Sequence, residues 1–239
     1  RYHLSITELP NNNYKPRVLD DRVGHFDIVF QDYNEMLSKS PYKRYITRWN
    51  LEKKNPRAKL SKPKEPIVFW IENTVPYKFR KAFRDGVLAW NSSFEKIGFK
   101  DAIVVKQMPD NADWDPADVR YNTIRWMIQP GSGIAVGPSR ANPMTGEIYD
   151  ADVRVSSDWI RHYYNEYTSQ VNPLLNPNIN PEIDSLHSHQ CSYSHEKQNQ
   201  MLFLWNYMVA NELIEGNDEE LDQFVYEGIV DLILQEVGH

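Results

Sequence analysis

The sequence predicts an α/β fold, in which a mixed, twisted five-stranded sheet with long helices follows a strand-containing N-terminal region. An apolar run of strand length, a long amphipathic helix and a second apolar run follow one another between residues 66 and 106. Three more strand-like runs then lead into helical patterns that continue to the last residue. Because 41% of the 239 residues are apolar, the chain can bury the core that such a fold needs.

Residues 1–65 form the predicted N-terminal region. The runs His25 to Phe30 and Tyr42 to Leu51 partly alternate bulky and polar residues, which indicates short strands. The region ends on EKKNPRAKLSKPKEP, where six Lys or Arg and three Pro fall within fifteen residues. This composition favours a solvated connection, with a basic contact patch as the alternative. We therefore expect residues 66–239 to form a second unit.

Residues 66–106 predict a strand, a helix and a strand. PIVFWIE, from Pro66 to Glu72, is almost continuously apolar, as in a strand covered on both faces. Apolar residues then recur at three- and four-residue steps, which is typical of an amphipathic helix of about five turns. They are Phe79, Phe83, Val87, Trp90, Phe94 and Ile97. DAIVVK, from Asp101 to Lys106, completes a right-handed parallel crossover.

The middle of the chain predicts three further strands. Tyr121 to Ile128 is the third, the short and glycine-flanked GIAVGPS is the fourth, and Ile148 to Ser156 alternates as the fifth. Between the last two, NPMTGE has the Asn-Pro and Thr-Gly content of a turn. WIRHYYNEYTSQV and the segment from about His195 to Leu213 are then expected to be helices.

The last predicted helix has a clear start. Asn217 can cap it, and Glu220, three residues later, can complete a capping box. One apolar stripe follows, formed by Leu221, Phe224, Val225, Ile229 and Leu232. Four tryptophans are expected to pack in the core, namely Trp90, Trp126, Trp159 and Trp205.

The chain ends on QEVGH, which differs at one position from the H-E-x-x-H pattern of zinc peptidases. Side chains four apart on a helix lie one turn above the other, so Gln235 and His239 could face one metal ion. Glu236 could then accept a proton from water that the metal acidifies. An amide oxygen is a poor zinc donor, so Gln235 lowers the expected affinity. Alternatively, all three are ordinary polar residues near a helix end.

Five longer stretches carry a more specific signal, and the order of the elements agrees with it. These stretches are YITRWNLEKK, PIVFWIE, GVLAWNSSFEKIGFKDAIVVK, YNTIRWM and GPSRANPMTGEIYDADV. The chain from about Pro16 to His239 resembles metzincin-type zinc metallopeptidases. It is most similar to a family of large bacterial zinc-dependent metallopeptidases whose last helix continues as H-E-x-G-H-x-x-G-x-x-H.

The resemblance implies a metzincin-like catalytic domain in residues 66–239 that hydrolyses peptide bonds with metal-activated water. It implies that Glu236 is the general base, that His239 is the second zinc ligand, and that Gln235 stands at the place of the first. The third ligand would fall at position 245. It also implies that an edge strand, formed by Gly133, Ile134, Ala135 and Val136, binds the peptide substrate by strand addition.

Because the chain starts at Arg1 and stops within the active-site helix, we expect an incomplete or inactive piece of a zinc endopeptidase. One alternative is an inactive, peptide-binding pseudo-peptidase, and a second is a purely structural domain. The resemblance places the parent protein outside the bacterial cell or in the periplasm.

Two other groups of residues could hold a metal ion. LHSHQCSYSH brings His187, His189, Cys191 and His195 within nine residues, with a polar loop as the alternative. Asp150 and Asp152 lie on one face of the predicted fifth strand; the resemblance to matrix-type relatives suggests Ca²⁺ there, and a solvated face is the alternative. Cys191 is the single cysteine, so no internal disulfide can form and the redox compartment stays open.

Charge and hydropathy restrict the partners. The formal net charge of -6 and the pI near 5.7 provide no general attraction to nucleic acid, which requires concentrated Lys and Arg. The sequence also lacks an apolar run near the roughly 20 residues that a membrane span needs. The expected partner is therefore a peptide or protein substrate.

Overall fold

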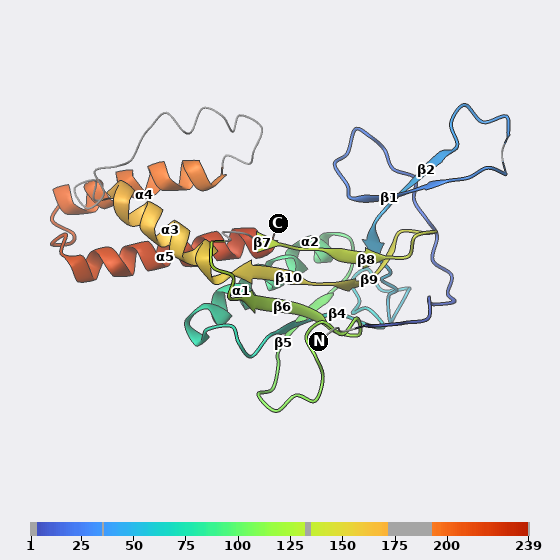
Figure 1. The fold of residues 1–239 in the computed structure, drawn as a ribbon, viewed down its shortest axis with the longest axis horizontal. Helices are drawn as coiled ribbons and strands as arrows, with labels where there is room; N and C mark the ends of the chain where they lie inside the picture. The colour runs from blue at the N-terminus through green and yellow to red at the C-terminus, as the bar shows by residue number, and fades with distance from the viewer. Residues whose placement is uncertain (1–3, 35, 132–134, 172–192, 239) are drawn as a thin grey trace.

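A computed structural model of the chain describes residues 4–34, 36–131, 135–171 and 193–238. It contains a five-stranded mixed sheet, a three-stranded sheet and a two-stranded sheet, which confirms the predicted α/β class. The β1–β2 hairpin lies at one end of the molecule and the helices α3, α4 and α5 extend from the other (Figure 1). Within the described part of the chain, every helix is too short or too polar to span a membrane.

The five-stranded sheet has the order β5-β4-β6-β10-β7. Its four parallel strands are β5 (Ile103–Gln107), β4 (Ile67–Ile71), β6 (Asn122–Met127) and β10 (Val153–Ser156). The short strand β7 (Ala135–Val136) pairs antiparallel with β10 and forms one edge. The pairing of β4 with β5 confirms that the strands of the predicted crossover are parallel.

The predicted five-turn helix is two helices, α1 (Tyr77–Ala89) and α2 (Asn91–Lys96). The Asn91 side chain accepts a hydrogen bond from the Ile103 amide (2.9 Å) and donates one to the Ile103 carbonyl (3.0 Å). These two bonds tie the start of α2 to β5, and the helix is interrupted at Trp90. Trp90 is consequently 46% exposed, so its expected place in the core is wrong.

The other three tryptophans pack against the core. Trp159 and Trp205 are buried, and the half-buried Trp126 stacks on Phe79. Trp159 lies on α3 (Ser157–Val171), whereas Trp205 lies on α4 (Tyr193–Ala210).

Helix α5 (Asp218–Gly238) begins with the predicted capping box. The Glu220 amide donates to Asn217 Oδ1 (3.0 Å), and the Asn217 amide donates to Glu220 Oε2 (3.3 Å). The predicted apolar stripe faces the core, where Leu221, Val225, Ile229, Leu232 and Ile233 are buried and Phe224 is half-buried. Helix α1 packs directly along α5, because Gly86 has no side chain to separate the two backbones.

Two predicted strands are each divided between sheets. Tyr42 to Leu51 becomes β2 (Tyr42–Ile46), which pairs with β1 (Asp27–Gln31), and β3 (Arg48–Trp49). Ile148 to Ser156 becomes β9 (Glu147–Ala151) and β10, separated at Asp152. The Asp152 amide donates to the Pro138 carbonyl (3.0 Å), which interrupts the strand between the two sheets.

The fourth predicted strand is divided into β7 and β8 (Ser139–Ala141), and β8 pairs with β9. Strand β3 pairs with the other side of β9, so the N-terminal region contributes one strand to the three-stranded sheet. The buried carboxylate of Glu147 accepts hydrogen bonds from the Asn12 (2.7 Å) and Asn50 (2.9 Å) amides. The N-terminal region is therefore joined to the larger sheet system by paired backbone and buried polar contacts.

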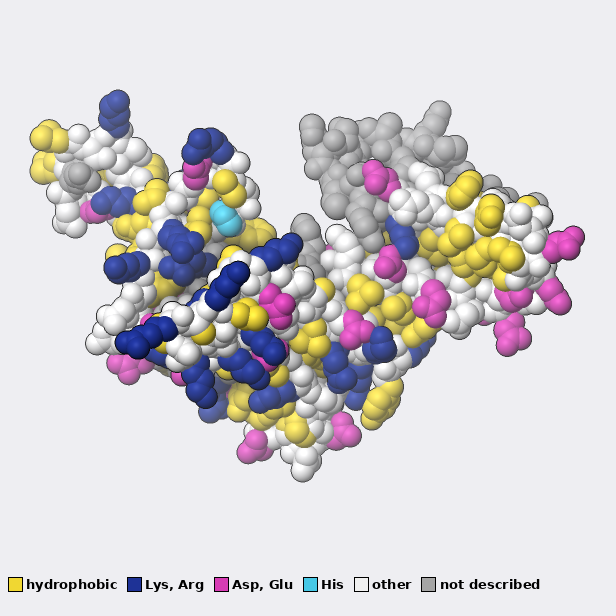
Figure 2. Space-filling model, turned by 180° about the vertical axis from the view of Figure 1, so that it is seen from behind, with side chains coloured by type: hydrophobic (Ala, Val, Ile, Leu, Met, Phe, Trp, Pro, Cys, Tyr) yellow, Lys and Arg dark blue, Asp and Glu magenta, His cyan; other side chains and the backbone are white. Residues whose placement is uncertain are grey.

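The basic segment after β3 is more than a solvated connection. Ser61 and Pro63 are buried, and the Ser61 backbone exchanges hydrogen bonds with Gly98 and Lys100. Lys and Arg side chains gather over the sheet and the N-terminal half of the molecule, whereas Asp and Glu side chains are more frequent at the helical end (Figure 2). The net acidic chain thus has an uneven surface charge.

The contact between α1 and α5 predicts the effect of Gly86→Ala. The new Cβ would lie 2.9 Å from the Leu234 carbonyl oxygen, and backbone must move to accept it. Overpacking costs about 1–3 kcal/mol and outweighs the roughly 1 kcal/mol that alanine gains in helix propensity. We expect a lower free energy of unfolding in urea. Arg84→Ala, at an exposed position of the same helix, should be nearly neutral, and an equal effect of both variants would contradict the packing argument.

Candidate functional site

A cavity of about 310 Å³ lies between the β7 edge and the last turns of α5. We call it the β7 cavity. Ala135 and Val136 of β7 line it together with Glu236 and Val237 of α5. Its remaining walls are mainly apolar and include Phe26, Phe69, Trp90, Val153 and Val155. The predicted general base and the described half of the predicted substrate strand therefore border the same space.

The core places Glu236 in this position. Leu232 and Ile233 are fully buried in the core cluster, and the next turn of α5 reaches the cavity. On the opposite side, Val136 is paired with Arg154 and Ala135 with Val155, which fixes β7 beside β10. Because β7 is an edge strand, its outer backbone groups face away from its only sheet partner.

Gln235 borders a different space. With Gly86, Ala89, Trp90, Ser93 and Leu234, it lines a cavity of about 280 Å³ between α1 and α5, which we call the α1 cavity. Its Oε1 atom is buried and has no hydrogen-bond partner among the described residues. Trp90 borders both cavities, so consecutive residues of α5 face two neighbouring spaces.

One predicted zinc ligand and two residues of the predicted substrate strand are not described. His239, Gly133 and Ile134 lie outside the described residues. The orphaned amide oxygen of Gln235 is a poor zinc donor compared with imidazole. Within the described ranges, no three His, Cys, Asp or Glu side chains gather into a group that could hold a metal. The residues present therefore do not fit a complete zinc site.

Most of the predicted histidine and cysteine cluster lies outside the residues that the structure describes. His187, His189 and Cys191 are not described. His195 lies in the first turns of α4, but its side chain is not described. Metal binding by these residues stays a prediction.

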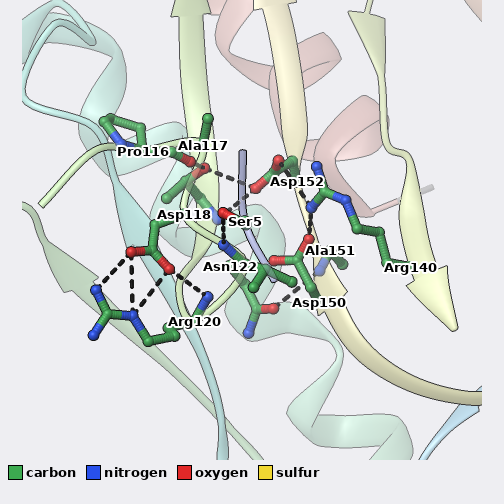
Figure 3. A network of polar contacts seen from close by, with 12 residues as sticks. Ser5, Pro116, Ala117, Asp118, Arg120, Asn122, Arg140, Asp150, Ala151 and Asp152 are labelled. Carbon is green, nitrogen blue, oxygen red and sulfur yellow. Dashed lines mark hydrogen bonds and ion pairs between the residues drawn. The ribbon is translucent and has the colours of Figure 1, made fainter. Parts of the chain in front are cut away.

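Asp150 and Asp152 form a buried ion-pair network, so their expected solvated face is wrong (Figure 3). Arg140 pairs with Asp150 and, at 3.8 Å, with Asp152, and Arg154 lies 3.9 Å from Asp152. Thr123 donates to Asp152 Oδ1 through its hydroxyl (2.8 Å) and its amide (3.3 Å). Two arginines thus supply the positive charge that a bound Ca²⁺ would bring.

The same network supports the β7 edge. Asp152 lines the β7 cavity and precedes β10, whose Arg154 is the pairing partner of Val136. Asn122 ties the neighbouring strands together by donating to the Val68 carbonyl (2.8 Å) and accepting from the Ala151 amide (3.0 Å). Buried polar contacts, rather than apolar packing alone, therefore set the register near the cavity.

The comparisons with known proteins concern mainly the N-terminal region. Residues 1–54 match a family model described as Domain of unknown function (DUF5117). No curated protein and no solved structure matches the chain. The DUF5117 region contains β1, β2 and β3, and it contributes Phe26 to the β7 cavity.

Sequence reasoning missed three of the residues at the site. Phe26 precedes a strand and has no motif of its own, and Trp90 has the helical spacing of a core residue. Arg140 stands beside a predicted turn, where an arginine is ordinarily solvated. Only the ion-pair network had a signal in the sequence. The alternation of Asp150 and Asp152 places both carboxylates on the same face of a strand.

The ion-pair network predicts that Asp152→Asn destabilises the protein by about 2 kcal/mol. The buried amide would remove the negative charge that faces Arg154 and would leave Arg140 with Asp150 alone, although both guanidinium groups are partly exposed and keep some water. Urea unfolding measures the effect. Asp85→Asn removes the surface pair with Lys81 and should cost less than 0.5 kcal/mol by the usual weakness of exposed ion pairs, so similar losses for both variants would argue against a buried network.

Proposed function

We propose that the chain is the N-terminal part of a zinc metalloendopeptidase catalytic domain, whose peptide substrate binds along β7 and is attacked beside Glu236. One observation carries the proposal, namely that the edge strand and Glu236 line one cavity. A carboxylate beside an extended backbone is the arrangement required to deprotonate water next to a peptide bond. The resemblance of five long stretches to bacterial zinc metallopeptidases supports the same function.

Strand addition explains how the substrate would be held. An extended peptide can pair with the free edge of β7, while alternate side chains enter the apolar β7 cavity. Backbone pairing binds many sequences, and the cavity walls then select among them. The substrate class is therefore an extended peptide or an unfolded segment of a protein.

The match of residues 1–54 gives independent support. Domains described as DUF5117 occur N-terminal to zinc metallopeptidase-like domains. In this chain the DUF5117 region stands before the unit that carries the β7 cavity, in the same order. The resemblance to exported peptidases favours an extracellular or periplasmic site of action.

Zinc, where it is bound, supplies a Lewis acid that makes water acidic enough to react near neutral pH. In this chain Gln235 replaces the first expected ligand, and its side chain borders the α1 cavity. This observation favours a second candidate, a pseudo-peptidase that binds peptide without cleaving it. Glu236 would then have no catalytic role, whereas β7 would still bind the peptide.

Gln235→His distinguishes the two functions. The variant carries six residues appended after His239, with a histidine at position 245, so that the third ligand of the family pattern is included. We expect elemental analysis to show about one zinc per chain in the variant and much less with Gln235, because imidazole binds zinc far better than an amide. Cleavage of unstructured casein should appear together with the metal.

Glu236→Gln in the Gln235→His background is the matched control. It should keep the zinc but lose cleavage by at least 100-fold, as expected for a missing general base. A zinc-free Gln235→His protein of native circular dichroism would overturn the peptidase proposal. Peptide binding without zinc or cleavage would instead identify the pseudo-peptidase.

A further inference from the structure

Phe26 is an exposed aromatic residue at a cavity wall. It lines the β7 cavity, and 84% of its surface is exposed. It also lines a second cavity of about 570 Å³, beside β8, which we call the β8 cavity. A large apolar side chain gains free energy when a ligand removes it from water. Its position next to two cavities therefore suggests contact with a ligand.

The backbone of Phe26 is held in place by the sheet. The Phe26 carbonyl accepts hydrogen bonds from the amide (2.8 Å) and the hydroxyl (3.2 Å) of Thr47. Thr47 directly precedes β3, and the next residue, Arg48, donates its amide to the Gly146 carbonyl (3.0 Å). These bonds tie the Phe26 backbone to the three-stranded sheet, whose outer strand β8 follows β7 in the chain.

The two cavities meet along that edge. Gly137 follows β7 and lines both of them, as does Phe26. A side chain at Gly137 would project into open space. The β8 cavity then continues along residues 137–141. A peptide added to β7 could extend from one cavity into the next and would pass Phe26.

We infer that Phe26 determines specificity in this peptide groove, and that the groove selects a peptide with a large apolar side chain beside Phe26. The inference rests on the proposed peptide binding and gives the DUF5117 region a direct part in it. The exposed ring of Phe26 and the half-exposed Trp90 offer apolar contacts in the β7 cavity. Glu236, in the same cavity, opposes an acidic side chain by like charge.

Three peptides test this assignment with the 239-residue chain. Each is a fluorescein-labelled decapeptide of Ser, Thr and Gly with one central Phe, Ala or Glu, and fluorescence anisotropy measures its Kd. We expect the Phe peptide to bind about tenfold more tightly than the Ala peptide, since burying about two methylene equivalents has this effect. The Glu peptide should bind most weakly.

Phe26→Ala should reduce the preference for Phe over Ala to about twofold or less by removing an apolar contact. Phe26→Leu, which keeps an apolar side chain, should retain most of the preference. Tyr33→Ala is the matched control, because Tyr33 is also an aromatic of the DUF5117 region, is 72% exposed and is not among the residues that line either cavity. Urea unfolding should show equal stability for all three variants.

Each outcome has a separate meaning. An unchanged preference in Phe26→Ala would overturn the inference and leave peptide binding intact. A uniform loss for all three peptides would show that Phe26 supports the groove without selecting the side chain, which also contradicts it. If the unmodified chain bound none of the peptides, the proposed function itself would fail.

Discussion

The close approach of α1 and α5 is the constraint on which the site depends. Gly86 lets the two backbones meet at Leu234, one residue before the terminal motif begins. Any larger side chain would move the last turns of α5 relative to the sheet. Glu236 reaches the β7 cavity from those turns. The contact between α1 and α5 therefore sets the distance between the Glu236 carboxylate and the edge strand β7.

A second constraint joins the DUF5117 region to the same site. Its strand β3 is hydrogen-bonded to β9. The buried Glu147 carboxylate also accepts hydrogen bonds from the side-chain amides of Asn12 and Asn50, both in that region. Separating the region would expose an edge of β9 and leave this carboxylate without partners, at a cost that buried charges make large. The region is therefore a structural part of the domain that carries the cavity. These contacts between the region and the domain also hold Phe26 at the cavity wall.

Local signals predicted much of this fold. The capping box at Asn217 and the apolar stripe that follows it depend only on spacing within one helix, and both were correct. The breaks at Trp90 and Asp152 depend on distant partners, because Asn91 bonds to Ile103 and the Asp152 amide bonds to Pro138. Hydrogen bonds between residues that are far apart in the chain produce no periodic pattern in the sequence. The edge strand and Glu236 were predicted from resemblance, whereas Phe26 could be found only from the folded arrangement.

The division between the two cavities bears on how catalysis and binding are related. Gln235 borders the α1 cavity, whereas Glu236 and the β7 edge border the β7 cavity. In the proposed function, a change of side chain at position 235 would alter metal affinity, and it would reach the peptide-binding walls through Trp90, which lines both cavities. The proposed peptide binding would depend on β7, the apolar walls and the Arg140 network, none of which includes Gln235. If the proposed function holds, one substitution at position 235 could convert a zinc peptidase into a pseudo-peptidase, because most of the residues that would hold the substrate lie apart from the residue that would hold the metal.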